Sequence, residues 1–335
     1  MFSPVWLRRV QRRHVLAALS FQALVAGVPA ARAGRTIRIV TGFPAGAGAD
    51  GVARVVSERL RQILNANVLV DSMPGAAARI AIEHVRTAPA DGSVLLLVPD
   101  ATMFLYALVY KTLKYDPVSD FTPLARLVSL SLAMFVGPMV PARVGTVAQY
   151  IDWAKSDPSR WIYGTSAPGA TPHFAGAMFA RAAGLALAAV HYQGGAPGIQ
   201  DLAGGHLPVF FGSVADGIGL LPGGKIRALA TTGSHRVAAL GNTPTFADLG
   251  YRDLVIEDGL GIHAPSKLPV AVGAELSAAL LQSLQSPEVN QMLRQRGFDV
   301  APEGPREFAQ RLQRERARWG PIVRARDGLA NPTEA

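Results

Sequence analysis

Three glycines near the start of the chain are spaced as G-x-G-x-x-G, a pattern that binds dinucleotide phosphates when it joins a strand to a helix. They are Gly46, Gly48 and Gly51 in the stretch RIVTGFPAGAGADGVARVV. Twenty residues later the run VLVD ends in Asp71, where a dinucleotide-binding fold places the acid that binds the ribose. The spacing therefore raises the hypothesis of an oxidoreductase that uses a nicotinamide or flavin cofactor.

The distance between the strand and these glycines argues against that hypothesis. In a dinucleotide-binding fold the first glycine follows the strand almost directly, so that the pyrophosphate meets the N-terminus of the next helix. Here residues 41–45 separate Val40 from Gly46. What remains is a loop of small residues whose N–H groups can approach an anion, next to the partial positive charge of a helix that begins near Asp50. We interpret Asp50 as the N-cap of this helix rather than as a catalytic acid.

A second loop of the same kind lies in the stretch YGTSAPGATPHFAGAMF, in the middle of the chain. It leads from a strand into a helix that has Pro172 near its first turn. Open α/β sheets bind ligands at the carboxyl ends of their strands, so the two loops are predicted to face each other across a cleft. A carboxylate held between two helix N-termini needs no lysine or arginine. His173 either contacts this ligand or hydrogen-bonds a nearby carbonyl group.

The sequence lacks the residue patterns of the common hydrolases. It contains no cysteine, no G-x-S-x-G and no H-E-x-x-H. The histidines after the N-terminal segment are scattered without metal-ligand spacing; they are His84, His173, His191, His206, His235 and His263. We therefore expect no enzyme, no catalytic residue, no metal and no cofactor, with an exported oxidoreductase and a hydrolase as less favoured alternatives.

The first 33 residues have the three parts of a secretory signal peptide. A basic start precedes an apolar run of about fourteen residues and the A-x-A sequence of residues 31–33. The run is too short to cross a bilayer as a helix. Arg12 and Arg13 approximate the twin-arginine pattern, so both the twin-arginine and the general export route stay open. We predict cleavage after Ala33 and a periplasmic protein; an amphipathic helix of the mature protein is the alternative.

The charge of the chain changes when this segment is removed. The segment holds five arginines and no acid, so the formal net charge falls from +9 to +4. The mature part has neither a basic stripe nor an aromatic platform, which argues against nucleic-acid binding. It also has no stretch long and apolar enough to cross a membrane. We expect a soluble exported protein.

Short apolar runs alternate with amphipathic stretches along the mature chain, which predicts an α/β fold with right-handed crossovers. TIRIV, NVLVD and SVLLLVP are expected strands, and a second α/β block of the same style follows from WIYGTS. The runs LSLAMFVGP and LVIEDGLGIHAP are expected to cross between two domains, residues 34–135 plus 257–335 and residues 136–256. The tail is predicted to be an amphipathic helix with Phe308, Leu312 and Trp319 inward and a solvated arginine face; a partner surface is the alternative interpretation of that face.

Many motifs in this sequence resemble, in the same order, those of the substrate-binding proteins of tripartite tricarboxylate transporters, the Bug family. The family's FPPGGGTD corresponds to FPAGAGAD at residues 43–50, and RPGAGG to MPGAAA at residues 73–78. APDGYTLL corresponds to APADGSVLL, with one extra residue, and LYKKLPYDPVKDF to LVYKTLKYDPVSDF. YGSAGNGSSPHLAGELF, YKGSAPALTDLLGG, GKLRALA and PTVAEAG correspond to YGTSAPGATPHFAGAMF, YQGGAPGIQDLAGG, GKIRALA and PTFADLG. The resemblance covers essentially the whole mature chain.

The resemblance implies an α/β type II periplasmic binding protein of the Venus-flytrap kind. Each of its two domains is a mostly parallel sheet flanked by helices, and two crossing strands form the hinge on which the domains close. Family ligands are mostly small carboxylates held by main-chain amides, hydroxyl groups and bridging waters. The implied ligand-binding residues are Phe43, Pro44, Ala45, Gly46, Ala47, Gly48, Ala49 and Asp50 in the first loop (residues 43–50), Thr165, Ser166, Gly169, Ala170 and Thr171 in the second loop (residues 165–171), and His173 and Gln193 nearby.

The implied function is to capture a small organic solute, a carboxylate or an amino-acid-like molecule, and to deliver it to the membrane permease subunits of a tripartite tricarboxylate transporter. A sensor that docks on a membrane receptor is the alternative, because both kinds of protein use the same cleft. We expect a monomer.

This sequence departs from the family pattern at four positions around the expected site. Ala47 replaces the middle glycine of the first loop, and Ala49 replaces a threonine. The family often has FDN where this chain has FGS, so Gly212 replaces an acid. SSGTHA becomes VPDATMF, which places Asp100 near the expected anion site. A carboxylate there repels a second carboxylate unless the ligand also carries an ammonium group; the alternative is that backbone amides satisfy Asp100. The ligand therefore stays open among carboxylates, amino acids and amides.

Overall fold

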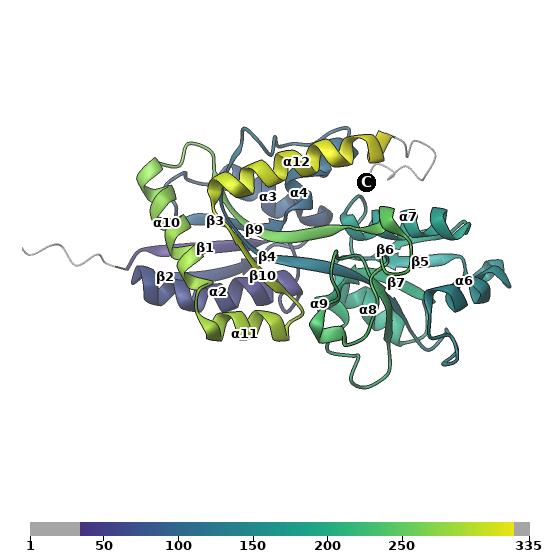
Figure 1. Cartoon of the computed structure of the whole chain (residues 1–335). Helices are drawn as coiled ribbons and strands as arrows, with labels where there is room; N and C mark the ends of the chain where they lie inside the picture. The colour runs from purple at the N-terminus through teal and green to yellow at the C-terminus, as the bar shows by residue number, and fades with distance from the viewer. Residues whose placement is uncertain (1–33, 325–335) are drawn as a thin grey trace, which may run out of the picture. The chain divides into compact units, whose positions relative to one another are not determined.

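The computed structural model describes residues 34–324, so the predicted signal peptide of residues 1–33 lies outside the described part. Contacts divide the chain into residues 1–35 and a second compact unit that begins at Thr36, and this second unit contains every helix and strand of the described residues. These strands form a ten-stranded sheet in the order β2-β1-β3-β9-β4-β7-β5-β6, with β10 and β8 also paired with β4 (Figure 1).

The strands are short, as the apolar runs predict, apart from one long strand in the middle of the sheet. Their bounds are β1 Thr36–Thr41, β2 Asn67–Ser72, β3 Val94–Pro99, β4 Phe121–Val136, β5 Ile162–Thr165, β6 Ala188–His191, β7 Val209–Ser213, β8 Arg227–Thr231, β9 Glu257–Pro265 and β10 Asp299–Glu303. Strands β2-β1-β3 are parallel to one another, and so are β6-β5-β7. Strands β9, β8 and β10 pair with β4 in antiparallel fashion, so the sheet as a whole is mixed.

Strand β4 links the two parallel groups through antiparallel pairing. Its first part, up to Ser131, pairs with β9, and β9 in turn pairs with β3. Its last part, from Leu132 to Val136, pairs with β7 and contributes to the pairing with β8. The two runs that were predicted to cross between domains are thus β4 and β9, which lie side by side. The domain boundaries themselves stay a prediction.

The helices flank the sheet on both faces. Their bounds are α2 Gly48–Leu64, α3 Arg79–Arg86, α4 Ala101–Phe104, α5 Tyr106–Val109, α6 Val147–Lys155, α7 Thr171–Ala183, α8 Gly195–Ala203, α9 Val214–Gly217, α10 Val270–Ser283, α11 Pro287–Gln295 and α12 Pro305–Arg324. In Figure 1, α2 and α11 lie below strands β2-β1-β3, and α3, α4 and α12 lie above them, while α10 packs against α2. Helices α7 and α8 both pack against β7.

Helix α2 shows why these segments fold as they do. Val52, Val55, Val56 and Leu60 recur every three or four residues and are all buried, so one face of the helix packs against the sheet. The helix ends at Asn65, which adopts the left-handed conformation and donates its N–H to the carbonyl of Arg61. The first turn of the helix follows the loop at the carboxyl end of β1.

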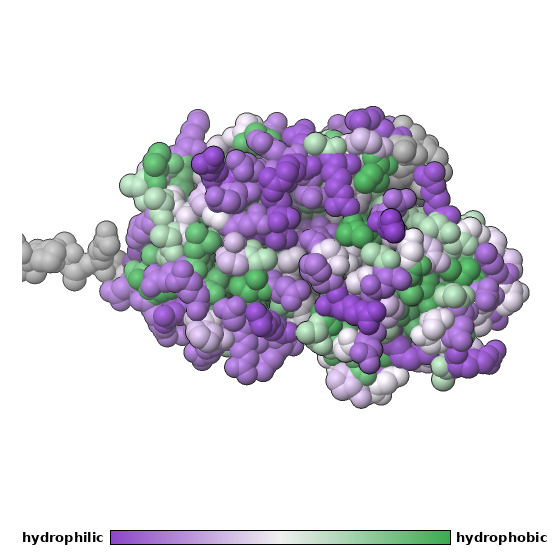
Figure 2. Space-filling model, viewed as in Figure 1, coloured by the Kyte–Doolittle hydropathy of each residue, from purple (hydrophilic) through white to green (hydrophobic). Residues whose placement is uncertain are grey.

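The tail helix α12 is amphipathic, as predicted. Phe308 and Trp319 are buried, and Leu312 packs against the core. Hydrophilic residues cover much of the surface over α12 (Figure 2), which fits a solvated arginine face. Between residues 34 and 324, no helix combines the length and the apolar character that a membrane span requires.

Candidate functional site

The first loop joins β1 to α2 and is held by a buried carboxylate. Gly46 has a φ of +83°, in the left-handed region that glycine adopts without strain, and its N–H donates to Asp50 Oδ2 at 2.9 Å. Asp50 also accepts from the Arg54 guanidinium at 2.8 and 3.0 Å and from the Ser72 hydroxyl at 3.3 Å. Burial opposes ionisation of Asp50, but the bonds from Arg54 and Gly46 outweigh it and lower the pKa of this carboxyl.

The prediction that Asp50 is the N-cap of α2 was wrong. The helix begins at Gly48, its N-cap is Ala47, and Asp50 lies in the first turn. The sequence did not reveal the first residue of α2, because Gly48 and Ala49 precede Asp50 in the helix and neither has a side chain that can cap a helix. Ala47 has a φ of −67° and extended backbone, so its Cβ is compatible with the loop conformation.

The second loop joins β5 to α7, and a buried histidine holds it. Gly169 has a φ of +71°, and its N–H donates to His173 Nδ1 at 3.0 Å. His173 is 2% exposed and packs edge-on against His191, with 4.7 Å between ring centroids. The imidazole accepts a hydrogen bond from a backbone N–H and lies behind the loop. This bond is neither a contact with a ligand nor a hydrogen bond to a carbonyl group, the two interpretations that the sequence left open for His173.

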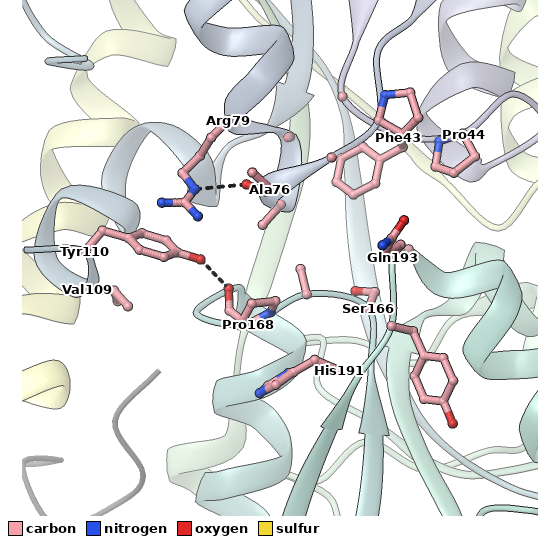
Figure 3. Close-up of a pocket in the computed structure, with 18 of the residues that line it drawn as sticks. Phe43, Pro44, Ala76, Arg79, Val109, Tyr110, Ser166, Pro168, His191 and Gln193 are labelled. Carbon is pink, nitrogen blue, oxygen red and sulfur yellow. Dashed lines mark hydrogen bonds between the residues drawn. The ribbon is translucent and has the colours of Figure 1, made fainter. Parts of the chain in front are cut away.

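The two loops meet at a small pocket and at a larger cavity. The inner pocket, of about 90 Å³, is lined by Phe43, Ala47, Gly48 and Ala49 from the first loop and by Ser166, Ala167, Ala170, Thr171 and Pro172 from the second loop and the start of α7. The outer cavity, of about 850 Å³, is lined by Phe43, Pro44, Ser166, Ala167 and Gln193, together with Arg79, Tyr110 and Lys111. Figure 3 shows Phe43 and Pro44 on one side of the outer cavity and Ser166 and Gln193 on the other.

The structure brings together only part of the predicted set. Seven of the predicted residues line the inner pocket; they are Phe43, Ala47, Gly48, Ala49, Ser166, Ala170 and Thr171. Pro44 and Gln193 line the outer cavity. The other predicted residues line neither space; they are Ala45, Gly46, Asp50, Asp100, Thr165, Gly169 and His173. Gly46, Asp50, Gly169 and His173 hydrogen-bond within the loops, so these four shape the loops from behind.

Asp100 was expected near the ligand or against backbone amides, and the structure places it elsewhere. Its Oδ2 accepts from Arg126 Nε at 2.7 Å, and both side chains are 3% exposed. Arg126 also donates to the carbonyl of Asp258 at 2.8 Å. Gly259 lies between them on β9, and a Cβ there would overlap both the carboxylate and the guanidinium. Asp100 is therefore part of a buried ion pair behind the pocket.

The inner pocket also has lining residues that were not predicted from the sequence, among them Gly195, Ser213, Asp216 and Asp258. Asp258 is 4% exposed; its Oδ2 accepts from the Thr171 hydroxyl at 2.7 Å, and its Oδ1 from the N–H groups of Gly259 and Ala101 at 2.8 and 3.2 Å. Burial raises the pKa of Asp258 despite these bonds. Ser213 and Asp216 form a capping box at α9, and their S-x-x-D spacing was the available signal.

Three helices of more than one turn begin at the inner pocket, beside the single-turn helices α4 and α5. Gly48, Thr171 and Gly195 are the first residues of α2, α7 and α8, and all three line the pocket. Helix N-termini carry partial positive charge and unpaired N–H groups, which favour anionic oxygens. Among the described residues, no lysine or arginine lines the inner pocket. The arrangement suits a carboxylate bound by the main chain.

Comparisons with known proteins agree with the resemblance seen in the sequence. Residues 52–328 match a model of the family described as "Tripartite tricarboxylate transporter family receptor" (TctC). A "UPF0065 protein in gbd 5'region" of Cupriavidus necator is 30% identical over 88% of this chain and 90% of its own length. A structure from R. palustris with adipate has a TM-score of 0.82 at 28% identity and covers 89% of this chain and 98% of that chain. The periplasmic binding protein BugD has a TM-score of 0.81 at 25% identity, with coverages of 87% and 97%. These likenesses confirm the predicted α/β periplasmic-binding-protein fold.

Proposed function

The chain belongs to the TctC family of tripartite tricarboxylate transporter receptors, which includes Bug proteins, and from this premise we propose that it is a periplasmic solute-binding protein that binds a small organic carboxylate or an amino-acid-like molecule. In this proposal the chain is exported, cleaved after Ala33, and delivers its solute to the permease subunits of a tripartite transporter. The adipate in the R. palustris relative supports a carboxylate-bearing ligand.

One observation carries the proposal: both small-residue loops line the same inner pocket, and the helices α2, α7 and α8 begin there. A carboxylate at this point accepts hydrogen bonds from first-turn N–H groups of α2 and α7 and gains from their partial positive charge. Phe43, Ser166 and Ala167 line both the inner pocket and the outer cavity, so a longer ligand extends from one into the other.

Closure of two domains around the ligand is part of the proposal. The proposed domains are residues 34–135 plus 257–335 and residues 136–256, and β4 continues from one into the other. Among the hydrogen bonds that join them in this structure, two involve the second loop: Tyr110 donates to the carbonyl of Pro168, and Thr171 donates to Asp258. Such bonds form only when the domains are close together, so they favour a closed, ligand-holding state.

The experiment starts from the full chain expressed with its N-terminal segment and recovered from the periplasm. Intact mass tests cleavage after Ala33, and size-exclusion chromatography tests the monomer. Thermal-shift measurements then screen monocarboxylates, dicarboxylates, amino acids and amides. A ligand that binds only the folded protein raises the free energy of unfolding by RT ln(1 + [L]/Kd), about 2.7 kcal/mol at a hundredfold excess over Kd.

We expect a member of these classes to stabilise the protein without being converted. Stabilisation by nicotinamide nucleotides alone, with redox turnover, would contradict the proposal and support the oxidoreductase.

A further inference from the structure

The inner pocket has a second acidic side chain, which replaces the acid absent at position 212. Asp216 lies in α9 and lines the pocket. Its Oδ2 accepts from the N–H of Ser213 at 2.9 Å, and this is the one hydrogen bond to the carboxyl group among residues 34–324. Asp216 is partly exposed as a residue, and its Oδ1 accepts no hydrogen bond from the described residues.

Two glycines make room for this carboxyl group. A Cβ at Gly195 would overlap the Asp216 carboxyl group, and a Cβ at Gly212 would lie 2.9 Å from its Oδ2 and overlap the ring of Phe210. An aspartate at position 212 would therefore compete with Asp216 for the same space. In this chain the acidic side chain reaches the pocket from α9, and it has room to do so because residue 212 is a glycine.

The position of Asp216 changes what the pocket accepts. Gly195 is the first residue of α8, so the Asp216 carboxyl group already occupies the N-terminus of one of the three longer helices that begin at the pocket. The N-termini of α2 and α7 remain for a ligand carboxylate. The other carboxyl group that lines the pocket is Asp258, and its oxygens already accept from Thr171, Gly259 and Ala101.

The negative charge of the pocket then determines which groups the ligand can carry beside its carboxylate. Asp216 and Asp258 both line the inner pocket, and no described lysine or arginine lines it to compensate them. A ligand with carboxylates alone would be repelled, whereas an ammonium group beside the carboxylate would be attracted. At roughly 30 Å³ for each water molecule, the pocket has room for a head group of a few heavy atoms.

Resting on the proposed function, we propose that this chain binds α-amino acids in preference to the corresponding plain carboxylates, with the ligand's ammonium group donating to Asp216 and its carboxylate facing the N-termini of α2 and α7. Asp216 is then a specificity-determining residue of the site. The side chain of the amino acid extends toward the outer cavity.

The test measures affinity by calorimetry for ligand pairs that differ in one ammonium group, such as L-aspartate against succinate and L-glutamate against glutarate, within a wider panel of amino acids and their deaminated forms. In the wild-type protein we expect the aminated member of the best-bound pair to bind at least tenfold more tightly. This comparison needs no variant, so it does not depend on whether a variant folds.

Asp216→Asn keeps an acceptor oxygen for the Ser213 N–H and removes the charge. We expect it to weaken binding of the aminated member at least tenfold and to leave the plain carboxylate unchanged or tighter. Asp152→Asn makes the same chemical change at an exposed position of α6 and is expected to alter none of the affinities.

The results that would overturn the inference differ in whether they also overturn the proposed function. If plain carboxylates bind the wild-type protein as tightly as their aminated partners, or if Asp216→Asn leaves the ratio unchanged, the assignment of Asp216 fails and the proposed function stands. If no member of any pair binds, the proposed function fails with it.

Discussion

The phenolic hydroxyl of Tyr110 donates a hydrogen bond to the carbonyl oxygen of Pro168 at 2.8 Å, across the outer cavity (Figure 3). The two residues are 58 positions apart in sequence, and they lie in different proposed domains. Arg79 lies over the Tyr110 ring, with its guanidinium carbon 4.2 Å from the ring centroid, and its Nε donates to the carbonyl of Ala76 at 2.9 Å. The tyrosine is thus held in place on one side of the cavity and bonded to the second loop on the other.

Tyr110→Phe should weaken ligand binding more than it weakens folding. A typical hydrogen bond contributes about 0.5–1.5 kcal/mol, so we expect the affinity to fall by roughly two- to tenfold. The unliganded protein should lose little stability if this bond forms mainly on closure. Calorimetry and thermal unfolding measure the two effects. Tyr115→Phe is the control, because its hydroxyl donates to the carbonyl of Thr102 within one proposed domain and Tyr115 lines neither the pocket nor the cavity. Equal losses of affinity in both variants would contradict the role of Tyr110 in closure.

Gly48→Leu should abolish ligand-induced stabilisation. A Cβ at this position already lies 3.1 Å from the Phe298 ring and 3.5 Å from Ala215, so a leucine side chain would extend into the inner pocket. The thermal shift produced by the best ligand of the screen is the measurement. Gly219→Leu is the matched control, since nothing lies within 4 Å of a Cβ there. Unchanged binding by the Gly48 variant would mean that the first loop is not the site.

Ala77→Gly should stabilise the protein. Ala76, Ala77 and Ala78 all have positive φ, of 46°, 55° and 71°, where a Cβ costs roughly 1–2 kcal/mol per residue. The resembling family motif RPGAGG has glycine at the second and third of these positions. After the greater chain entropy of glycine is subtracted, we expect a gain of about 0.5–1 kcal/mol in the free energy of unfolding. Chemical denaturation measures it.

The control for this substitution is Ala81→Gly in α3, whose position is an ordinary helical one. It should destabilise the protein by roughly 1 kcal/mol. A loss of stability in Ala77→Gly as well would show that the alanines are not strained.

The pH dependence of binding should follow Asp216. Desolvation by the surrounding chain, only partly offset by the Ser213 N–H, raises the pKa of Asp216 to about 7. An unfolded aspartate has a pKa of about 3.9, so between these values the folded chain holds a proton that the unfolded chain has released. Stability contributed by this group is therefore lost as the pH rises from about 4 to 7. The other carboxyl group of the inner pocket, Asp258, also has a raised pKa.

Binding of an ammonium-bearing ligand should change in the opposite direction. It needs the ionised carboxylate, whose fraction rises about thirtyfold between pH 5.5 and 8, so we expect the affinity for the preferred amino acid to rise by roughly this factor. Calorimetry at the two pH values measures this, and Asp216→Asn should flatten the profile. An affinity that is the same at both pH values in the wild-type protein would contradict the prediction.

Much of the fold could be predicted from the sequence because its signals are local. Strands β1, β2 and β3 coincide with short apolar runs, and α12 follows the spacing of Phe308 and Trp319. The two small-residue loops could be placed at strand ends for the same reason, and both line one pocket. The start of α2 was misplaced because Gly48 and Ala49 carry no capping signal.

What only the tertiary structure decided is which distant side chains share a space. The order β3-β9-β4 brings Asp100 against Arg126, with Gly259 between them, so an acid expected at the ligand is paired behind the pocket. Asp216 reaches the pocket because Gly195 and Gly212, from two other elements, leave its carboxyl group room. Spacing along the chain determines which residues end a strand or begin a helix. Strand order and packing determine which of them meet, and these depend on contacts between residues far apart in sequence.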